Sequence, residues 1–247
     1  VIGTSADLYV KHFDTRVKRF DLTNNMAFDM PVINIDGLSA SVKQWSVASN
    51  QEAPKASDFG IKDPTVEASS LLPDLSTKQL NLKNIFVRYE DESSQMKTKF
   101  DIKNLLANVE KIDLNKEIVK LQEVKLDDSD SEVLLGKIIK KPDTSSNSTP
   151  VNWVVSADKL VVNKTNVWFK DDNQARSKGL DYFNLKLSDF AAVMEDLYYS
   201  SDSISGNLEN LTVKDHSGFS LKQVKADFVY GNQGAIIKDL LIETPYS

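Results

Sequence analysis

The side chains that could carry catalysis or hold a metal are few in this sequence, and their spacing suits neither role. The two histidines, His12 and His216, lie in no His-x-x-x-His or Glu-x-x-His pattern, so the spacing of metal ligands is missing. Asp215, His216 and Ser217 are residue types of a catalytic triad, but consecutive residues of a turn cannot form the nucleophile–base–orienter geometry. We therefore expect a solvated turn at this point.

The acidic run from Asp127 to Glu132 supplies oxygen atoms of the kind that Ca²⁺ prefers. It lacks the loop glycine and the final glutamate of an EF-hand, so we expect an acidic hairpin tip instead. The chain has no cysteine, which removes cysteine zinc sites and thiol catalysis together. No Gly-x-Gly-x-x-Gly or Gly-Lys-Ser/Thr motif is present to cradle a phosphate. We expect no enzyme activity, no cofactor and no metal.

Charge and hydropathy exclude two further classes of protein. The 247 residues include 30 Lys+Arg and 36 Asp+Glu, which are interspersed along the chain and give a net charge of −6. A nucleic-acid-binding protein normally shows a basic stripe, and none is found here. No apolar run is long enough to span a membrane, and the N-terminus lacks a signal-peptide pattern. We expect any membrane anchor to lie outside this chain.

Short alternating apolar runs are the elements that present the remaining side chains. Residues 80–82 and 85–89 alternate between apolar and polar side chains, but the alternation changes phase at Asn84, and residues 160–169 repeat this arrangement. A two-residue period places apolar side chains on one face of a strand, and a phase change within a run indicates a bulge or a break. The pattern predicts an all-β chain with one apolar face.

Two stretches also fit the spacing of an amphipathic helix, which leaves strand and helix open for residues 100–113 and 186–200. The apolar residues concerned are Ile102, Leu105, Leu106, Val109 and Ile112 in the first stretch, and Phe190, Ala191, Val193, Met194, Leu197 and Tyr198 in the second. The two stretches fall at corresponding positions of an internal repeat, so we expect both to have the same structure.

Two long polar loops divide the chain, and the parts that follow them look like copies of one unit. Residues 80–91 align without a gap on residues 160–171. Repetition of a unit that cannot close a core alone is typical of a stacked array. We expect a partial β repeat over 1–50, a linker loop over 51–70, a β repeat over 71–140, a linker over 141–150 and a β repeat over 151–247.

The apolar stripe is the feature that could bind a ligand. If it stays open, its lining would come from both copies of the repeat, namely Leu80, Leu82, Ile85, Val87, Tyr89, Leu160, Val162, Val167 and Phe169. The alternative is ordinary core in a β-sandwich with one or two short helices, whose second sheet covers the stripe. Such a closed module would serve binding or adhesion to carbohydrate or protein, and Trp45, Trp153 and Trp168 could stack on sugars.

Three segments, in order along the chain, carry a likeness to a known family. They are residues 71–91, which begin Leu71-Leu-Pro-Asp-Leu-Ser, residues 100–115, and residues 227–247 with Phe228 and Tyr230. Together they resemble the TamB/AsmA-like translocation and assembly module family in its Bacteroidota form. The second copy of the repeat departs from the family pattern, because it has no Leu-Pro-Asp-Leu-Ser opening.

This resemblance implies an extended antiparallel sheet curved into a β-taco with an apolar concave face. It implies a periplasmic segment, anchored to the inner membrane by a part of the protein outside this chain, that reaches toward an Omp85-type outer-membrane protein. The expected cargo is phospholipid or another acyl-chain ligand. A chaperone-like role in outer-membrane protein assembly, by strand addition at the sheet edges, stays open as an alternative.

Overall fold

The computed structural model describes residues 2–22, 27–46, 72–137, 152–178, 180–232 and 234–245. Within these ranges the regular structure is β-strand, and none of it is helix. The all-β prediction is therefore confirmed, and residues 100–113 and 186–200 fall in strands. The linkers predicted over 51–70 and 141–150 lie outside the described residues.

Eleven of the described strands form one sheet. They are β1 (Ile2–Thr15), β4 (Val32–Ser46), β6 (Gln79–Asp91), β7 (Met96–Asp113), β8 (Ile118–Leu135), β9 (Val154–Asp171), β10 (Asn184–Tyr199), β11 (Ser203–Asp215), β12 (Ser220–Leu221), β13 (Gln223–Gly231) and β14 (Gly234–Glu243). Three short strands form a separate small sheet, namely β2 (Arg19–Asp21), β3 (Ala27–Asp29) and β5 (Asp74–Ser76).

The large sheet runs in the order β1-β4-β6-β7-β8-β9-β10-β11-β13-β14, with β12 paired to β11. Neighbouring strands are antiparallel except for β4 with β6 and β8 with β9, which are parallel. A parallel pair needs a connection that carries the chain back to its starting end. The two parallel pairs coincide with the two long polar loops, so the three parts of the chain join edge to edge in one sheet.

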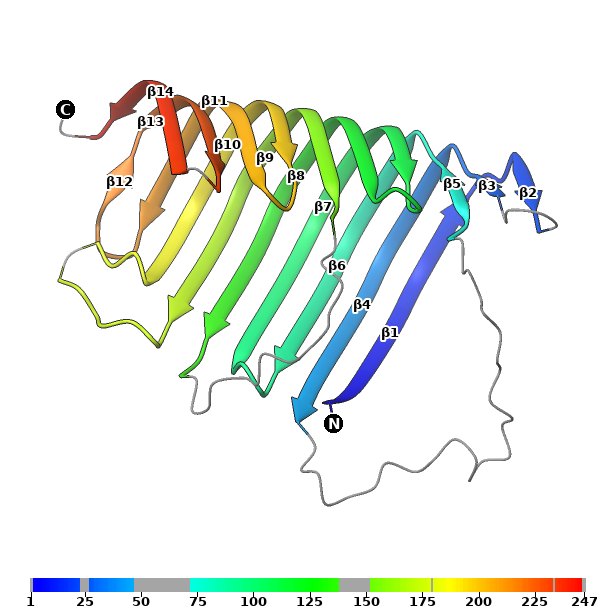
Figure 1. The fold of residues 1–247 in the computed structure, drawn as a ribbon, viewed down its shortest axis with the longest axis horizontal. Coiled ribbons are helices and arrows are strands. Elements are labelled where there is room, and N and C mark those ends of the chain that lie inside the picture. The colour runs from blue at the N-terminus through cyan, green and yellow to red at the C-terminus, as the bar shows by residue number, and fades with distance from the viewer. Residues whose placement is uncertain are drawn as a thin grey trace.

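The sheet is open and curled, because its strands bend over along one side (Figure 1). The bend has a backbone signature, a line of positive-φ residues inside five strands: Gly37, Asn84, Asp128, Lys164 and Asp189. Register places Gly37 next to Asn84, and Asp128 next to Lys164, which the pairs Asp127–Asn163 and Ser129–Thr165 flank. The line passes through β7 without a positive-φ residue there, and it reaches β10 at Asp189, near Asn166. We call this line of residues the crease.

The crease changes which residues of a strand face inward. In a regular strand residues i and i+2 share a face. Val162 comes before the crease in β9, and Thr165 comes after it. Phe190 pairs with Thr165, and it nevertheless packs in the same apolar cluster as Val162. A positive-φ residue therefore shifts the alternation by one position, so that both arms of a bent strand turn their apolar side chains inward. This is the phase change predicted at Asn84.

Two such shifts explain why β10 imitates a helix in the sequence. Positive φ at Asp189 and at Asp196 coincides with breaks in its register. The residues of β10 that pair with inward-facing partners on β9 are Leu187, Phe190, Ala192, Met194 and Leu197. The intervals between them along the chain are consequently three, two, two and three residues. Intervals of this kind resemble the helical period, although the backbone is extended throughout.

The acidic run from Asp127 to Glu132 is not a hairpin tip, and that prediction was wrong. The run lies inside β8, where Asp128 has φ 59° and forms part of the crease. Aspartate and asparagine tolerate the left-handed region better than most residues, because their short polar side chains bond locally. The residue types that normally mark a turn here mark a bend within a strand.

Burial is shallow over the whole sheet. Among the described residues ten hydrophobic side chains are buried, and four of them are alanines: Ala107, Ala157, Ala192 and Ala226. Small side chains suit the concave side of a curled sheet, where Cβ atoms converge. The largest fully buried side chain is that of Ser129. A single curled layer accounts for this pattern, since a closed sandwich would enclose large aliphatic and aromatic residues.

Candidate functional site

The candidate site is the concave side of the sheet, which we call the inner face. Cross-strand partners share a face, and five rows of partners cross β6, β7, β8 and β9 without a break. The rows are Leu80–Ala107–Val124–Leu160, Leu82–Leu105–Leu126–Val162, Ile85–Ile102–Ser129–Thr165, Val87–Phe100–Ser131–Val167 and Tyr89–Thr98–Val133–Phe169. All nine predicted lining residues lie in these rows, so the structure brings them onto one surface.

The rows continue beyond β6, β7, β8 and β9. On one side they extend into β4, through Ile33, Ile35, Ala40 and Val42. On the other side they extend into β10, through Leu185, Leu187, Phe190, Ala192 and Met194. Sequence reasoning missed these residues because the crease interrupts their alternation, although the same phase rule that holds at Asn84 would have identified them.

The inner face is not covered by a second layer of the described chain. Of the nine predicted residues Ile85 and Val162 are buried, and the other seven are partly exposed. The main contacts between described strands join neighbours within a sheet, apart from those of β5 with β7. The apolar rows therefore line an open trough that crosses six strands, from β4 to β10, of a sheet about 43 Å across at about 4.8 Å per strand.

Few polar groups interrupt the inner face, and two of them satisfy each other. Ser129 and Thr165 lie in adjacent strands at the crease, and their hydroxyl oxygens are 2.9 Å apart. They are 1% and 4% exposed, so a ligand in the trough would not reach them. The Tyr89 hydroxyl donates a hydrogen bond to Gln44. The lining thus offers apolar contact and few free hydrogen-bonding groups.

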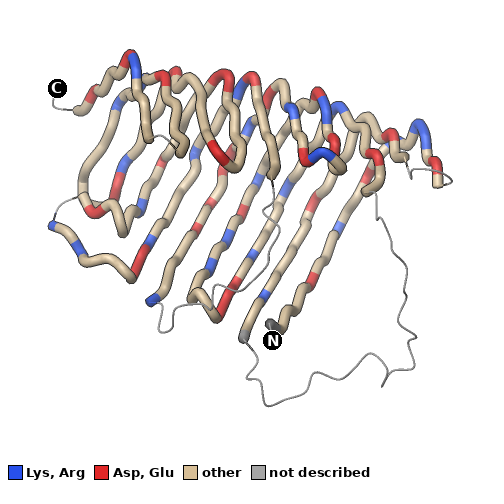
Figure 2. The backbone as a smooth tube through the Cα atoms, in the orientation of Figure 1, with Lys and Arg blue, Asp and Glu red and all other residues tan. Residues whose placement is uncertain are grey.

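The opposite, outer face carries charges of both signs. Basic residues there pair with carboxylates two positions away in the sequence, as in Lys103–Asp101, Lys125–Glu123 and Lys170–Asp172. Figure 2 shows acidic and basic residues interspersed along the strands, with no basic stripe. The outer face is therefore a solvated surface without the electrostatic pattern of a nucleic-acid-binding protein.

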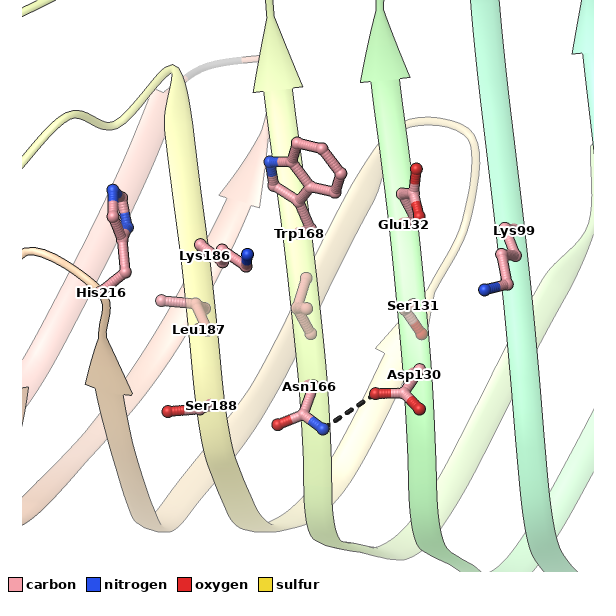
Figure 3. Close-up of a pocket in the computed structure, with 11 residues that line it drawn as sticks. Lys99, Asp130, Ser131, Glu132, Asn166, Trp168, Lys186, Leu187, Ser188 and His216 are labelled. Carbon is pink, nitrogen blue, oxygen red and sulfur yellow. Dashed lines mark hydrogen bonds between the residues drawn. The ribbon is translucent and has the colours of Figure 1, made fainter.

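The outer face also has an open hollow of about 620 Å³, which sequence reasoning did not anticipate. It lies over β7 to β10 and is lined by Lys99, Asp130, Glu132, Trp168 and Lys186 among others (Figure 3). In that view the ribbons of β8 and β9 turn away at the crease, just beyond Asp130 and Asn166. The hollow and the trough are on opposite sides of the same strands.

Groups that could support other chemistry are not brought together. Within the described ranges no cluster of three metal-ligating side chains occurs, and no helix is long and apolar enough to cross a membrane. His12 lies on the edge strand β1, whereas His216 lies in the turn after β11, with Nδ1 3.3 Å from Asp215. The turn predicted there is confirmed.

Comparison with protein-family models, with curated proteins and with solved structures finds no match to this chain. The TamB/AsmA-like likeness therefore stays a prediction.

Proposed function

We propose that the chain is a periplasmic segment of a bridge-like protein that carries phospholipid between the inner and outer membranes in its trough. The observation that carries this proposal is the inner face, an apolar surface that continues from strand to strand and lies open among the described residues. An inner-membrane anchor and an Omp85-type outer-membrane partner act through regions outside the chain. The likeness of residues 71–91 to the TamB/AsmA-like family supports the same function.

The energetics of the trough suit a carrier. Burying a methylene group gains about 0.8 kcal/mol, so a long acyl chain gains on the order of 10 kcal/mol on entering. A similar gain awaits the chain in a membrane, so that loading and release are nearly balanced. Because the rows repeat from strand to strand, a lipid that moves along them exchanges like contacts for like. The phosphate head group stays in water and needs no site of its own.

A charge placed on the inner face tests this proposal. Val87→Glu and Val167→Glu each put a carboxylate among acyl chains, where an unpaired charge is costly. We expect native mass spectrometry, after incubation with phosphatidylethanolamine vesicles, to show several-fold less bound phospholipid for either variant. Both positions are only partly buried, so the variants should still fold.

The adjacent residue supplies the control. Phe86 lies on the outer face, where it lines a depression with Arg88 and Lys97. Phe86→Glu adds the same charge one residue away from Val87, and should leave lipid binding unchanged. Normal lipid binding by both inner-face variants, or equal losses in Phe86→Glu and Val87→Glu, would argue against the trough.

Assistance to outer-membrane protein assembly is the second candidate function, and the edge strands favour it. β14 ends the large sheet, and all of its described residues are exposed. An extended segment of an unfolded β-barrel protein could add to such an edge through backbone hydrogen bonds. This role predicts binding of synthetic barrel-strand peptides that detergent does not displace, whereas lipid carriage predicts displacement by detergent.

A further inference from the structure

The hollow on the outer face combines an aromatic ring with polar groups from four strands. Trp168 projects from β9, and its two neighbours across the sheet are Glu132 on β8 and Lys186 on β10. The Nζ atom of Lys186 lies 5.6 Å from the centre of the indole ring. Trp168 is half-buried although it is on the solvated side of the sheet. A large aromatic side chain is thus held in place at an accessible surface (Figure 3).

The charges in the hollow differ from several of the paired charges elsewhere on the outer face. Lys103 and Lys125 pair with carboxylates on their own strands, and Lys170 pairs with Asp172 just after its strand. Lys99 and Glu132 are opposite each other in the register of β7 and β8, yet neither makes an ion pair or a side-chain hydrogen bond with any described residue. The hollow therefore offers an ammonium group and a carboxylate that are free to bond a ligand.

The second row of the hollow is more rigid. The Asn166 side chain donates a hydrogen bond to Asp130 at 2.8 Å and accepts one from the backbone N–H of Asp189. These bonds fix the amide and orient one oxygen of the Asp130 carboxylate. The other Asp130 oxygen has no hydrogen bond within the described residues, and adds a second acceptor to the hollow.

We propose that this hollow binds a neutral saccharide. A sugar ring presents an apolar C–H face that packs on an aromatic ring, and hydroxyl groups that both donate and accept. Trp168 supplies the apolar platform, the carboxylates of Asp130 and Glu132 accept, and Lys99 donates. Two carboxylates beside two lysines disfavour a phosphorylated or acidic ligand. The side chains proposed to contact the sugar, namely those of Trp168, Asp130, Glu132 and Lys99, are on the face opposite the trough.

Tryptophan-selective NMR tests the proposal on the intact chain. The protein has three tryptophans, Trp45, Trp153 and Trp168, so ¹⁵N-tryptophan labelling gives three indole N–H signals at most. Trp168→Phe assigns the signal that matters. We expect cellotetraose or maltotetraose at about 10 mM to shift the Trp168 signal alone, as befits a weak surface site. We expect inorganic tripolyphosphate to have no such effect.

Two matched variants on β8 extend the test. Glu132→Ala should weaken saccharide binding about tenfold, the size of effect seen when a hydrogen bond to a charged group is lost. Glu123→Ala removes the same residue type from the outer face of the same strand, away from the hollow, and should change nothing. The proposal is overturned if neither saccharide shifts the Trp168 signal, if Trp45 or Trp153 responds instead, or if tripolyphosphate produces an equal shift.

Discussion

Single residues set the curvature of the sheet. Lys164 takes up φ 50° in the middle of β9, with its side chain exposed. The left-handed region is costly for a residue with a Cβ atom, whereas glycine enters it freely, as Gly37 does at the corresponding point of β4. We expect Lys164→Gly to raise the free energy of unfolding by about 0.5–1 kcal/mol, measured by urea denaturation.

The same substitution in a regular part of the sheet serves as the control. Lys120 is exposed on β8 and has no positive φ. Glycine there relieves no strain and gains freedom only in the unfolded chain, so Lys120→Gly should lower stability by about 0.5–1 kcal/mol. If both variants were destabilised alike, positive φ would not be what matters at the crease.

The hydroxyl pair at the crease makes a second prediction at this scale. Ser129 and Thr165 are buried and bonded to each other. Thr165→Val leaves the Ser129 hydroxyl without its partner, which costs about 1–3 kcal/mol. Adding Ser129→Ala removes the orphaned group, so the double variant should be more stable than Thr165→Val alone. Urea midpoints of the four proteins in this double-mutant cycle measure the coupling, and simple additivity would contradict it.

Asp215 makes the fold sensitive to acid. Burial alone would raise the pKa of its carboxyl, but hydrogen bonds to the ionised form outweigh burial and lower the pKa to about 2. The donors include the backbone N–H groups of Ser217 at 2.8 Å and Lys186 at 3.0 Å. A carboxyl whose pKa is depressed on folding contributes stability above its unfolded pKa of about 3.9, and loses that contribution as the pH falls through the folded pKa.

Asp215→Asn should therefore be less stable than the natural protein at neutral pH. The difference in urea midpoint should shrink as the pH falls from about 4 to about 2, because the natural carboxyl becomes protonated over that window. A difference that stays constant across the window would show that the carboxylate charge contributes nothing. The readout is a series of urea titrations at stepped pH.

At the scale of elements, the edge strands of the large sheet are the parts that could associate with other chains. β14 presents large apolar side chains to solvent, among them Ile236 and Ile237, each 58% exposed. Unpaired apolar edges template association with other chains, and lysine on an edge strand opposes it. We expect Ile236→Lys to reduce concentration-dependent association in sedimentation velocity.

Gln122→Lys is the matched control, since it places the same charge at an exposed position on the interior strand β8. It should leave association as it is in the natural protein. Equal effects of the two variants would mean that net charge, and not the edge, governs association.

The strands themselves were largely predictable, and the helix-like spacing of β10 has a physical cause. Alternation identified β6 and β9 because each contains a single phase change, at Asn84 and at Lys164. β10 contains two positive-φ residues, Asp189 and Asp196, and its apolar intervals therefore fit a helix equally well. Propensity cannot separate these cases, since a bend within a strand uses the same Asp and Asn residues as a turn between strands.

For the whole molecule, sequence patterning predicted an apolar face but could not establish whether that face is covered. An open trough and a closed sandwich need the same alternation, and they differ in contacts between residues far apart in the chain. The parallel pairing of β4 with β6 and of β8 with β9 decides the question, because it lines the units up in one layer instead of stacking them. The hollow on the outer face could not be predicted from the sequence either, because only the strand register brings Lys99, Glu132 and Trp168 together.

The line of positive-φ residues also determines how deep the trough is. The number of residues between the crease and the end of each strand fixes the depth of that arm, independently of how many strands the sheet contains. Inserting two residues into every arm would deepen the bore by about 6.6 Å and leave each side chain on its present side. Inserting a single residue would move the apolar side chains beyond the insertion to the outer face. The depth of the trough can therefore change only in steps of two residues per arm.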